Sequence, residues 1–263
     1  MKIINSFLLA FAMYSRIPVP KTEWNADNMK YSMIFFPFVG AVIAALLFAW
    51  HSLSSCFGKL IPSEAEALIA LSIPVFISGG IHLDGFMDTS DALSSHQGKK
   101  RKLEIMKDSN TGAFAVINLA LYFALFFAAY LILLKSRTEY GIFALGFVLS
   151  RILSGMGVVF FKSAKSDGLL YTFADSAELT TTRAFLAAEF IVCEAAMIHI
   201  NPIGAFVTLL LNLIFMFFYY KMTEREFGGI TGDTCGWFSS NSELISAYGA
   251  ALGVIITKGI MKI

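Results

Sequence analysis

Apolar segments of about 20 residues recur along this chain, and they strongly limit what the chain can fold into. A helix of that length crosses the hydrocarbon core of a bilayer, which is about 30 Å thick. Hydrophobic residues make up 57% of the sequence and charged residues only 15%, whereas a soluble domain carries about 25% charged residues. We therefore expect an all-α fold, a polytopic integral membrane bundle with about seven transmembrane helices.

The distribution of apolar residues predicts where these helices cross the bilayer. Residues 1–263 are expected to form a single domain within the lipid bilayer. The second and fifth spans are short or interrupted, and residues 1–14 are apolar but too short to span. The expected spans are Tyr31–His51, Ala65–Ile81, Gly112–Leu134, Tyr140–Phe161, Arg183–Ile200, Pro202–Lys221 and Glu243–Lys258.

Lysine and arginine residues are divided unequally between the two sides of these spans. With the first span starting inside, 14 fall on one side and 5 on the other, and Arg151 lies within a span. Because basic residues favour the cytoplasmic side, we expect a multi-pass protein of the prokaryotic inner or plasma membrane with its active site facing the cytoplasm. The predicted cytoplasmic motif loops are 82–111, 162–183 and 222–242. The 14 residues are Lys2, Arg16, Lys21, Lys30, Lys99, Lys100, Arg101, Lys102, Lys107, Lys162, Lys165, Arg183, Lys221 and Arg225, and the 5 are Lys59, Lys135, Arg137, Lys258 and Lys262.

Charge and cysteine content narrow the function classes further. A net charge of +1 gives no support to a nucleic-acid partner. The three cysteines are scattered, which suggests neither a disulfide framework nor a zinc site. The basic run 99–102 is interpreted as an orientation signal rather than a substrate clamp. The motif-like polar segments are all predicted on one side of the membrane, and the sequence contains no internal repeat. Both features favour an enzyme over a transporter.

An acidic stripe is the strongest chemical signal in the sequence. Asp84, Asp88 and Asp91 are spaced i, i+4, i+7, and on a helix their directions fall within about 60° of one another. Such carboxylates repel each other unless a cation lies among them, and Mg²⁺ with a phosphorylated substrate is the usual occupant. The alternative is a solvated acidic segment outside the membrane. Gly85 would let the backbone approach a phosphate, and His82 would contact phosphate, act as an acid or base, or form a structural hydrogen bond.

A second polar element follows within residues 103–112. Glu104 and Asp108 are again spaced i, i+4, and Glu104 is a candidate metal ligand. Lys107 lies between them as a candidate substrate contact. Ser109 or Thr111 is expected to cap the next helix. Asp108 either reaches the metal cluster or interacts only with the helix dipole.

A third element is the glycine-rich segment 228–236. Its glycines would allow Thr231 and Gly232 to approach substrate oxygens closely. Asp233 and, ten residues later, Glu243 are candidate metal ligands. The alternative is an ordinary turn before the last span. Arg151, inside the fourth span, is expected to pair with a carboxylate or with a substrate phosphate. Together the three elements suggest transfer of a substituted phosphate from a nucleoside diphosphate to an alcohol.

Five segments, in order, resemble motifs of the cobalamin synthase (adenosylcobinamide-GDP ribazoletransferase) family. Four positions depart from the family pattern: Ser15 replaces Thr, Ala92 replaces Gly, Lys165 replaces Arg and Trp237 replaces Ala. None of the departures touches an acidic residue. The segments are Ser15–Pro20, Gly79–Asp91, Glu104–Gly112, Ser150–Arg151 followed by Ala164–Leu169, and Gly228–Gly236 with Glu243.

The resemblance implies the final assembly step of cobalamin. Adenosylcobinamide-GDP and α-ribazole, or its 5′-phosphate, would give adenosylcobalamin, or its 5′-phosphate, and GMP, with Mg²⁺ as cofactor. Lys165 and Gly168 then join the substrate-binding candidates. The alternatives are a CDP-alcohol phosphotransferase, whose D-G-x-x-A-R run is absent here, and a carrier for a cobamide or cation. The sequence leaves open a homo-oligomer or a complex with other cobamide-assembly enzymes.

Overall fold

The computed structural model describes residues 2–134, 136–164 and 178–260, and over these residues the chain is helical. One isolated bridge, between Ser163 and Ile230, is the only extended pairing among the described residues. The predicted all-α membrane fold is thus confirmed.

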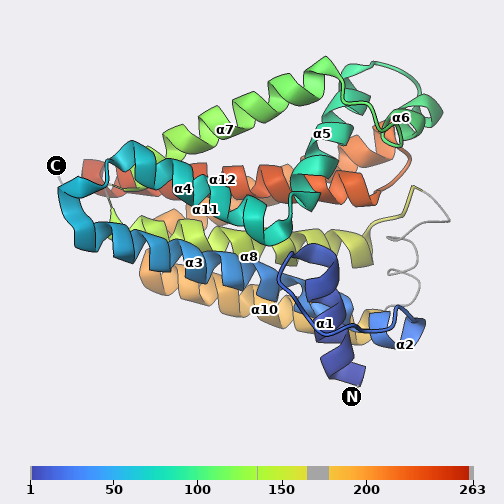
Figure 1. Ribbon diagram of the computed structural model, residues 1–263, viewed down its shortest axis with the longest axis horizontal. Coiled ribbons are helices and arrows are strands. Elements are labelled where there is room, and N and C mark those ends of the chain that lie inside the picture. The colour runs from blue at the N-terminus through green and yellow to red at the C-terminus, as the bar shows by residue number, and fades with distance from the viewer. Residues whose placement is uncertain (1, 135, 165–177, 261–263) are drawn as a thin grey trace.

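Long helices run along the molecule's long axis and form the bundle (Figure 1). They alternate in direction along the chain, so that their connections gather at two ends. The bundle helices are α3 (Phe36–Phe57), α4 (Ser63–Ser78), α7 (Ala113–Leu133), α8 (Arg137–Phe160), α10 (Leu179–Ile200), α11 (Pro202–Glu226) and α12 (Gly232–Ile260).

Fewer helices are strongly apolar than the sequence led us to expect. Four described helical segments are long and apolar enough to cross a membrane, or five if α4 and α5 count as one bent span, against the predicted seven. α10 has the required length but carries Arg183, Glu189 and Glu194, and α12 begins with a polar run. The last predicted span, Glu243–Lys258, is therefore the second half of a longer helix that starts at Gly232.

A sharp bend separates α4 from α5 (Ile81–Ser94). Gly79 and Gly80 both adopt positive φ values, 66° and 82°, which glycine reaches without steric cost. The bend between the two helices is 94°. α5 consequently crosses the end of the bundle instead of running along it (Figure 1), and we treat α5 as lying outside the spanning segments.

The same end of the bundle holds the other short N-terminal and central helices (Figure 1). The opposite end holds the α3–α4, α7–α8 and α10–α11 connections. The expected segments 82–111 and 222–242 lie at the α5 end, but they are largely helix rather than loop. Most of the third expected segment, 162–183, lies outside the described residues. The short helices are α1 (Lys2–Tyr14), α2 (Ala26–Met29), η1 (Ser32–Phe35) and α6 (Lys99–Ile105), and η2 (Gly58–Leu60) lies after α3.

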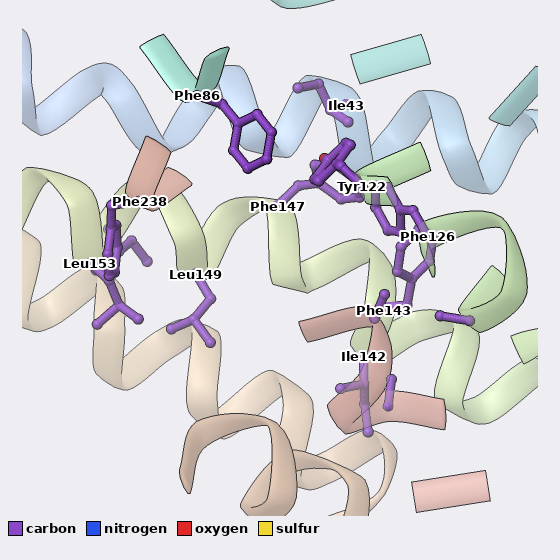
Figure 2. Close-up of a cluster of buried hydrophobic side chains, with 14 of the residues drawn as sticks. Ile43, Phe86, Tyr122, Phe126, Ile142, Phe143, Phe147, Leu149, Leu153 and Phe238 are labelled. Carbon is purple, nitrogen blue, oxygen red and sulfur yellow. The ribbon is translucent and has the colours of Figure 1, made fainter. Parts of the chain in front are cut away.

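Helix α8 is the centre of the core. In the most apolar stretch of α8, 83% is buried inside the protein, whereas in the corresponding stretches of α7 and α11 only 28% is buried. Figure 2 shows aromatic rings from α7 and α8 packed together, and Phe143 contacts both Phe126 and Phe147 in edge-to-face geometry. Such contacts add to the favourable burial of aromatic area. α8 is therefore the buried helix around which the rest of the bundle packs.

Candidate functional site

The candidate site forms where α5 meets the first turns of α12. A Cβ atom at Gly85 would come within 2.6 Å of the carbonyl oxygen of Asp233. One turn along α12, a Cβ atom at Gly236 would come within 3.0 Å of the carbonyl oxygen of His82. Helix backbones approach this closely only where side chains are missing. Gly85 thus approaches α12 rather than a phosphate, and the contact brings Asp233 to the acidic stripe.

Four aspartates make up the acidic cluster: Asp84, Asp88 and Asp91 of α5 and Asp233 of α12. Partial burial raises the pKa of Asp88 to about 6, and the negative charges of Asp84, Asp233 and Asp91 act in the same direction. Neighbouring carboxylates disfavour each other's charged form unless an opposite charge lies close. The arrangement therefore favours a cation at the cluster.

Asp91 has a structural partner that the sequence did not indicate. Its Oδ2 accepts a hydrogen bond from the N–H of Gly112 at 2.6 Å, and its Oδ1 accepts one from the N–H of Ala115 at 2.8 Å. These N–H groups belong to the first turn of α7, whose N-cap residue Gly112 offers no side-chain acceptor. Asp91 therefore caps α7, the role expected for Ser109 or Thr111.

The glycine-rich segment forms the N-terminus of α12 instead of a substrate loop. The N–H of Thr231 donates to Thr234 Oγ1 at 2.8 Å, and the N–H of Thr234 donates to Thr231 Oγ1 at 3.1 Å. This reciprocal capping satisfies N–H groups that would otherwise lack partners. Thr231 is thus committed to the helix start, while Gly232 and Asp233 in the first turn face a cavity.

The segment before α12 also pairs with the chain after α8. The N–H of Ala164 donates to the carbonyl of Ile230, and the N–H of Ile230 donates to the carbonyl of Lys162, both at 2.8 Å. Gly229 permits this approach, because a Cβ there would lie 2.4 Å from the Lys162 carbonyl oxygen. Two motifs about 65 residues apart are thereby held together. Lys165 and Gly168, the substrate-binding candidates that follow, lie outside the described residues.

A cavity of about 220 Å³, here called the α5–α12 cavity, opens beside the acidic cluster. Asp84 and Asp233 line it, and His82 lies in its wall beside the rings of Phe36 and Tyr14, with ring centroids 5.7 and 6.4 Å away. No sequence pattern indicated this aromatic wall, since its rings come from distant positions in α1, α3 and α5. Other lining residues are Met13, Met33, Ile81, Ser154, Val158, Gly232, Cys235, Gly236 and Ser239.

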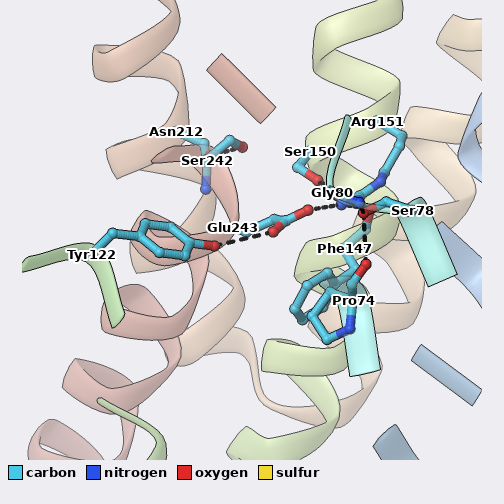
Figure 3. Close-up of polar contacts among 10 residues, drawn as sticks. All are labelled: Pro74, Ser78, Gly80, Tyr122, Phe147, Ser150, Arg151, Asn212, Ser242 and Glu243. Atoms are coloured by element: carbon cyan, nitrogen blue, oxygen red, sulfur yellow. Dashed lines mark hydrogen bonds and ion pairs between the residues drawn. The ribbon is translucent and has the colours of Figure 1, made fainter. Parts of the chain in front are cut away.

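Arg151 is buried at the middle of the bundle, where Figure 3 shows its contacts. Its guanidinium donates to Glu243 Oε1, to Ser150 Oγ at 2.8 Å and to the Phe147 carbonyl at 3.2 Å. The Tyr122 hydroxyl donates to Glu243 Oε2 at 3.4 Å. Of the two partners expected for Arg151, the structure shows the carboxylate. The assignment of Glu243 to the metal is corrected accordingly, because its charge is neutralised within the core.

Two side chains of the second polar element have local partners. Asp108 is exposed, and hydrogen bonds from the N–H and the Nδ2 group of Asn110, at 3.0 and 2.7 Å, lower its pKa. Glu104 forms an exposed pair with Arg101 at 3.0 Å, and Lys107 is exposed to solvent. Glu104 and Asp108 thus pair locally, and the metal and substrate roles expected of Glu104, Lys107 and Asp108 stay predictions.

The basic run at α6 is partly structural. Lys102 is buried and donates to Glu226 Oε2 at the end of α11. Lys99 Nζ donates to the Glu224 carbonyl at 3.0 Å. Both contacts bring a positive charge to the C-terminal end of α11, where the helix dipole favours cations. The Lys99 contact also gives a hydrogen-bond donor to a carbonyl of the last turn.

The donor set of the acidic cluster suits a hard divalent cation. Among the described side chains, no three His, Cys, Asp or Glu residues are grouped so that they could enclose a metal by themselves. Mg²⁺ does not need such a cage, because it takes one or two carboxylates and completes its shell with water and substrate phosphates. Asp84 and Asp233 line one cavity with Asp88 close by, so the residues present fit Mg²⁺ better than they fit a metal held by protein alone.

Comparisons with known proteins cover nearly the whole chain. A family model described as cobalamin-5-phosphate synthase matches residues 6–251. The adenosylcobinamide-GDP ribazoletransferase of Lachnoclostridium phytofermentans is 42% identical over 99% of this chain and 97% of its own length. Proteins of the same name from Halalkalibacterium halodurans and Geobacillus sp. are 32% and 31% identical, covering 92% and 91% of this chain and 93% and 92% of their own lengths. No solved structure matches.

Proposed function

The chain belongs to the cobalamin-5-phosphate synthase family, and from this premise we propose that it is an adenosylcobinamide-GDP ribazoletransferase. It transfers the adenosylcobinamide phosphate group of adenosylcobinamide-GDP to α-ribazole or to α-ribazole 5′-phosphate. The products are adenosylcobalamin, or its 5′-phosphate, and GMP. This is the final assembly step of cobalamin.

The reaction exchanges one phosphorus–oxygen bond for another. A ribose hydroxyl of α-ribazole forms a bond to the phosphorus on the cobinamide side of the diphosphate. The bond from that phosphorus to the bridging oxygen breaks, and GMP leaves with the bridging oxygen and its electron pair. The hydroxyl proton passes to solvent or to a nearby base. The protein must position the two substrates and stabilise the charge of the departing phosphate.

The acidic cluster is the observation that carries the proposal. Asp84, Asp88 and Asp233 would hold Mg²⁺, which when bound supplies neutralisation of the diphosphate charge. Asp84 and Asp233 border the α5–α12 cavity, so these side chains orient what enters it. Asp91 fixes the start of α7 against α5 and thereby holds the cluster in place.

A cation for the leaving phosphate must come from a residue other than Arg151, which is buried and paired. Arg16 is exposed, and its side chain lies over the bend before α5: a Cβ atom at Gly79 would come within 2.8 Å of Arg16 Nε. The N–H of Arg16 donates to the Ile77 carbonyl at 2.7 Å, which holds the segment there. We assign Arg16 this role together with Lys165, because a guanidinium binds phosphate with two parallel hydrogen bonds.

The several long apolar helices make this a multi-pass membrane protein. We place it in the prokaryotic inner membrane with the acidic cluster facing the cytoplasm. The support is the 14-to-5 distribution of basic residues, whose larger share belongs to segments at the α5 end of the bundle.

Product formation by the purified protein tests the proposed function. With adenosylcobinamide-GDP and Mg²⁺, we expect GMP to appear only when α-ribazole or its 5′-phosphate is added, with one cobalamin formed for each GMP. GMP release without cobalamin would indicate a hydrolase. Activity on a CDP-alcohol would favour the alcohol phosphotransferase class, and binding of a cobamide without any product would favour a carrier.

A further inference from the structure

We propose that the α5–α12 cavity binds the benzimidazole base of α-ribazole and so selects the acceptor substrate. This inference rests on the proposed function and identifies which part of which substrate the site receives. The cavity measures about 220 Å³ and is bordered by Asp84 and Asp233. Sites for drug-sized ligands measure about 300–1,000 Å³, so the cavity takes one planar fragment rather than a whole substrate.

The wall of the cavity matches an aromatic, largely apolar fragment. Phe36 and Tyr14 lie with their ring centroids 4.3 Å apart, and Met13, Met33 and Val158 add apolar surface. Aromatic rings pack well against other rings, and methionine side chains adapt to irregular apolar shapes. A benzimidazole carrying two methyl groups presents that kind of surface.

Besides the carboxylates of Asp84 and Asp233, the wall carries polar groups that can bind the single free ring nitrogen of the base. His82 is 7% exposed, and neither of its ring nitrogens has a hydrogen-bond partner among the described residues. Ser239 Oγ is likewise buried without a partner there, and Ser154 lines the same space. Each of these groups can donate to a ring nitrogen.

The position of the cavity agrees with the chemistry of the acceptor. Asp84 and Asp233 line the same cavity as Phe36, Met33 and Val158, so a base seated there would bring its ribose close to these carboxylates. The ribose hydroxyl would then lie beside the carboxylates that we assign to the diphosphate site. The donor substrate, with its guanine and corrin, would approach from outside the cavity.

Filling the cavity tests this inference through kinetics. We expect Val158→Phe to raise the KM for α-ribazole at least tenfold, about the penalty for overfilling a packed site, with kcat within threefold of wild type and the KM for adenosylcobinamide-GDP within twofold. Val148→Phe is the matched control, because it makes the same change on α8 beside a separate groove that faces α10. Val148→Phe should change neither KM.

A milder variant and a wild-type measurement cover the case in which Val158→Phe does not fold. Phe36→Leu removes one aromatic wall and should raise the KM for α-ribazole about threefold or more. On the wild-type enzyme, 5,6-dimethylbenzimidazole alone should inhibit competitively against α-ribazole and not against adenosylcobinamide-GDP.

The inference is overturned if the base fails to inhibit, or if it competes with adenosylcobinamide-GDP. A rise in the KM for adenosylcobinamide-GDP alone, in Val158→Phe or Phe36→Leu, would also overturn it. If wild-type protein releases no GMP, the proposed function fails. Calorimetric binding of α-ribazole to wild type and to Phe36→Leu then still tests the cavity, with weaker binding to the variant expected and equal binding contradicting the inference.

Discussion

Asp91 differs from the other aspartates of the acidic cluster because both of its carboxylate oxygens accept hydrogen bonds from the backbone of α7. We expect Asp91→Ala to lower the free energy of unfolding by about 0.5–2 kcal/mol, the usual cost of losing a helix cap. The measurement is thermal denaturation of the purified protein in detergent. Asp108→Ala, which changes an exposed aspartate outside the cluster, is the control. An unchanged melting temperature combined with lost activity would instead make Asp91 a metal ligand.

Arg151 and Glu243 neutralise each other in the core, and their separate removal should therefore be costly. We expect Arg151→Met to lower the free energy of unfolding by about 3–5 kcal/mol, because it leaves the Glu243 carboxylate buried without a counter-charge. The double variant Arg151→Met/Glu243→Leu should recover most of this loss. Denaturation of the three proteins measures the effect. A stable Arg151→Met variant with a raised KM for adenosylcobinamide-GDP would show that Arg151 contacts substrate after all.

At the level of elements, the contact between α5 and α12 decides whether the cluster exists. A side chain at position 85 would meet the Asp233 backbone at 2.6 Å, which cannot move away cheaply. We expect Gly85→Ala to separate the helices, to cost about 1–3 kcal/mol of stability and to reduce GMP release at least tenfold. Gly98→Ala is the control, because nothing lies within 4 Å of a Cβ there. Full activity of Gly85→Ala would mean that the close contact is not needed for the site.

Local patterns predicted some of these elements well. The i, i+4, i+7 spacing placed Asp84, Asp88 and Asp91 on one helix, and α5 has that form. The apolar runs located most bundle helices, because the backbone N–H and C=O groups of an apolar segment in lipid must be hydrogen-bonded within the segment, as they are in a helix. The start of α12 was placed eleven residues late, at Glu243 instead of Gly232, because its polar first turns resemble a loop in composition although Thr231 and Thr234 cap them.

Contacts between distant elements could not be predicted from the sequence. Arg151 gave no local hint that it would pair with Glu243, which lies 92 residues later. The aromatic wall of the α5–α12 cavity combines Tyr14 and Phe36 with His82, and no periodicity connects these positions. Asp91 was grouped with the metal candidates because its charge was visible, whereas its backbone partners in α7 were not.

For the whole molecule, the arrangement separates a lipid-facing bundle from one polar end. α7 and α11 expose large apolar side chains, among them Ile117, Leu121, Leu213 and Phe217, while α8 is enclosed. All the motif segments that the structure describes lie at or near the α5 end, apart from the buried Arg151–Glu243 pair. We therefore expect both substrates to reach the protein from one side of the membrane.

The proposed orientation predicts which cysteine a membrane-impermeant thiol reagent reaches in intact cells. Cys56 is exposed at the end of α3 that lies far from α5, so it should be labelled from outside once Cys193 and Cys235 are changed to Ser. In a Cys56→Ser background, Lys100→Cys should be labelled only after the cells are opened. Labelling of position 100 in intact cells would reverse the orientation and would place the acidic cluster outside.

The magnesium dependence of α-ribazole-dependent GMP release tests the central claim most directly, because it joins the acidic cluster to the reaction. We expect wild-type protein and Asp108→Asn to release GMP with the same Mg²⁺ requirement and to stop when the metal is chelated. Asp84→Asn and Asp88→Asn should remain folded in membranes and lose about 100-fold or more of the rate, as expected when a group that stabilises developing charge is removed. Near-wild-type release by both of these variants at limiting Mg²⁺ would contradict the assignment of the transfer to this cluster.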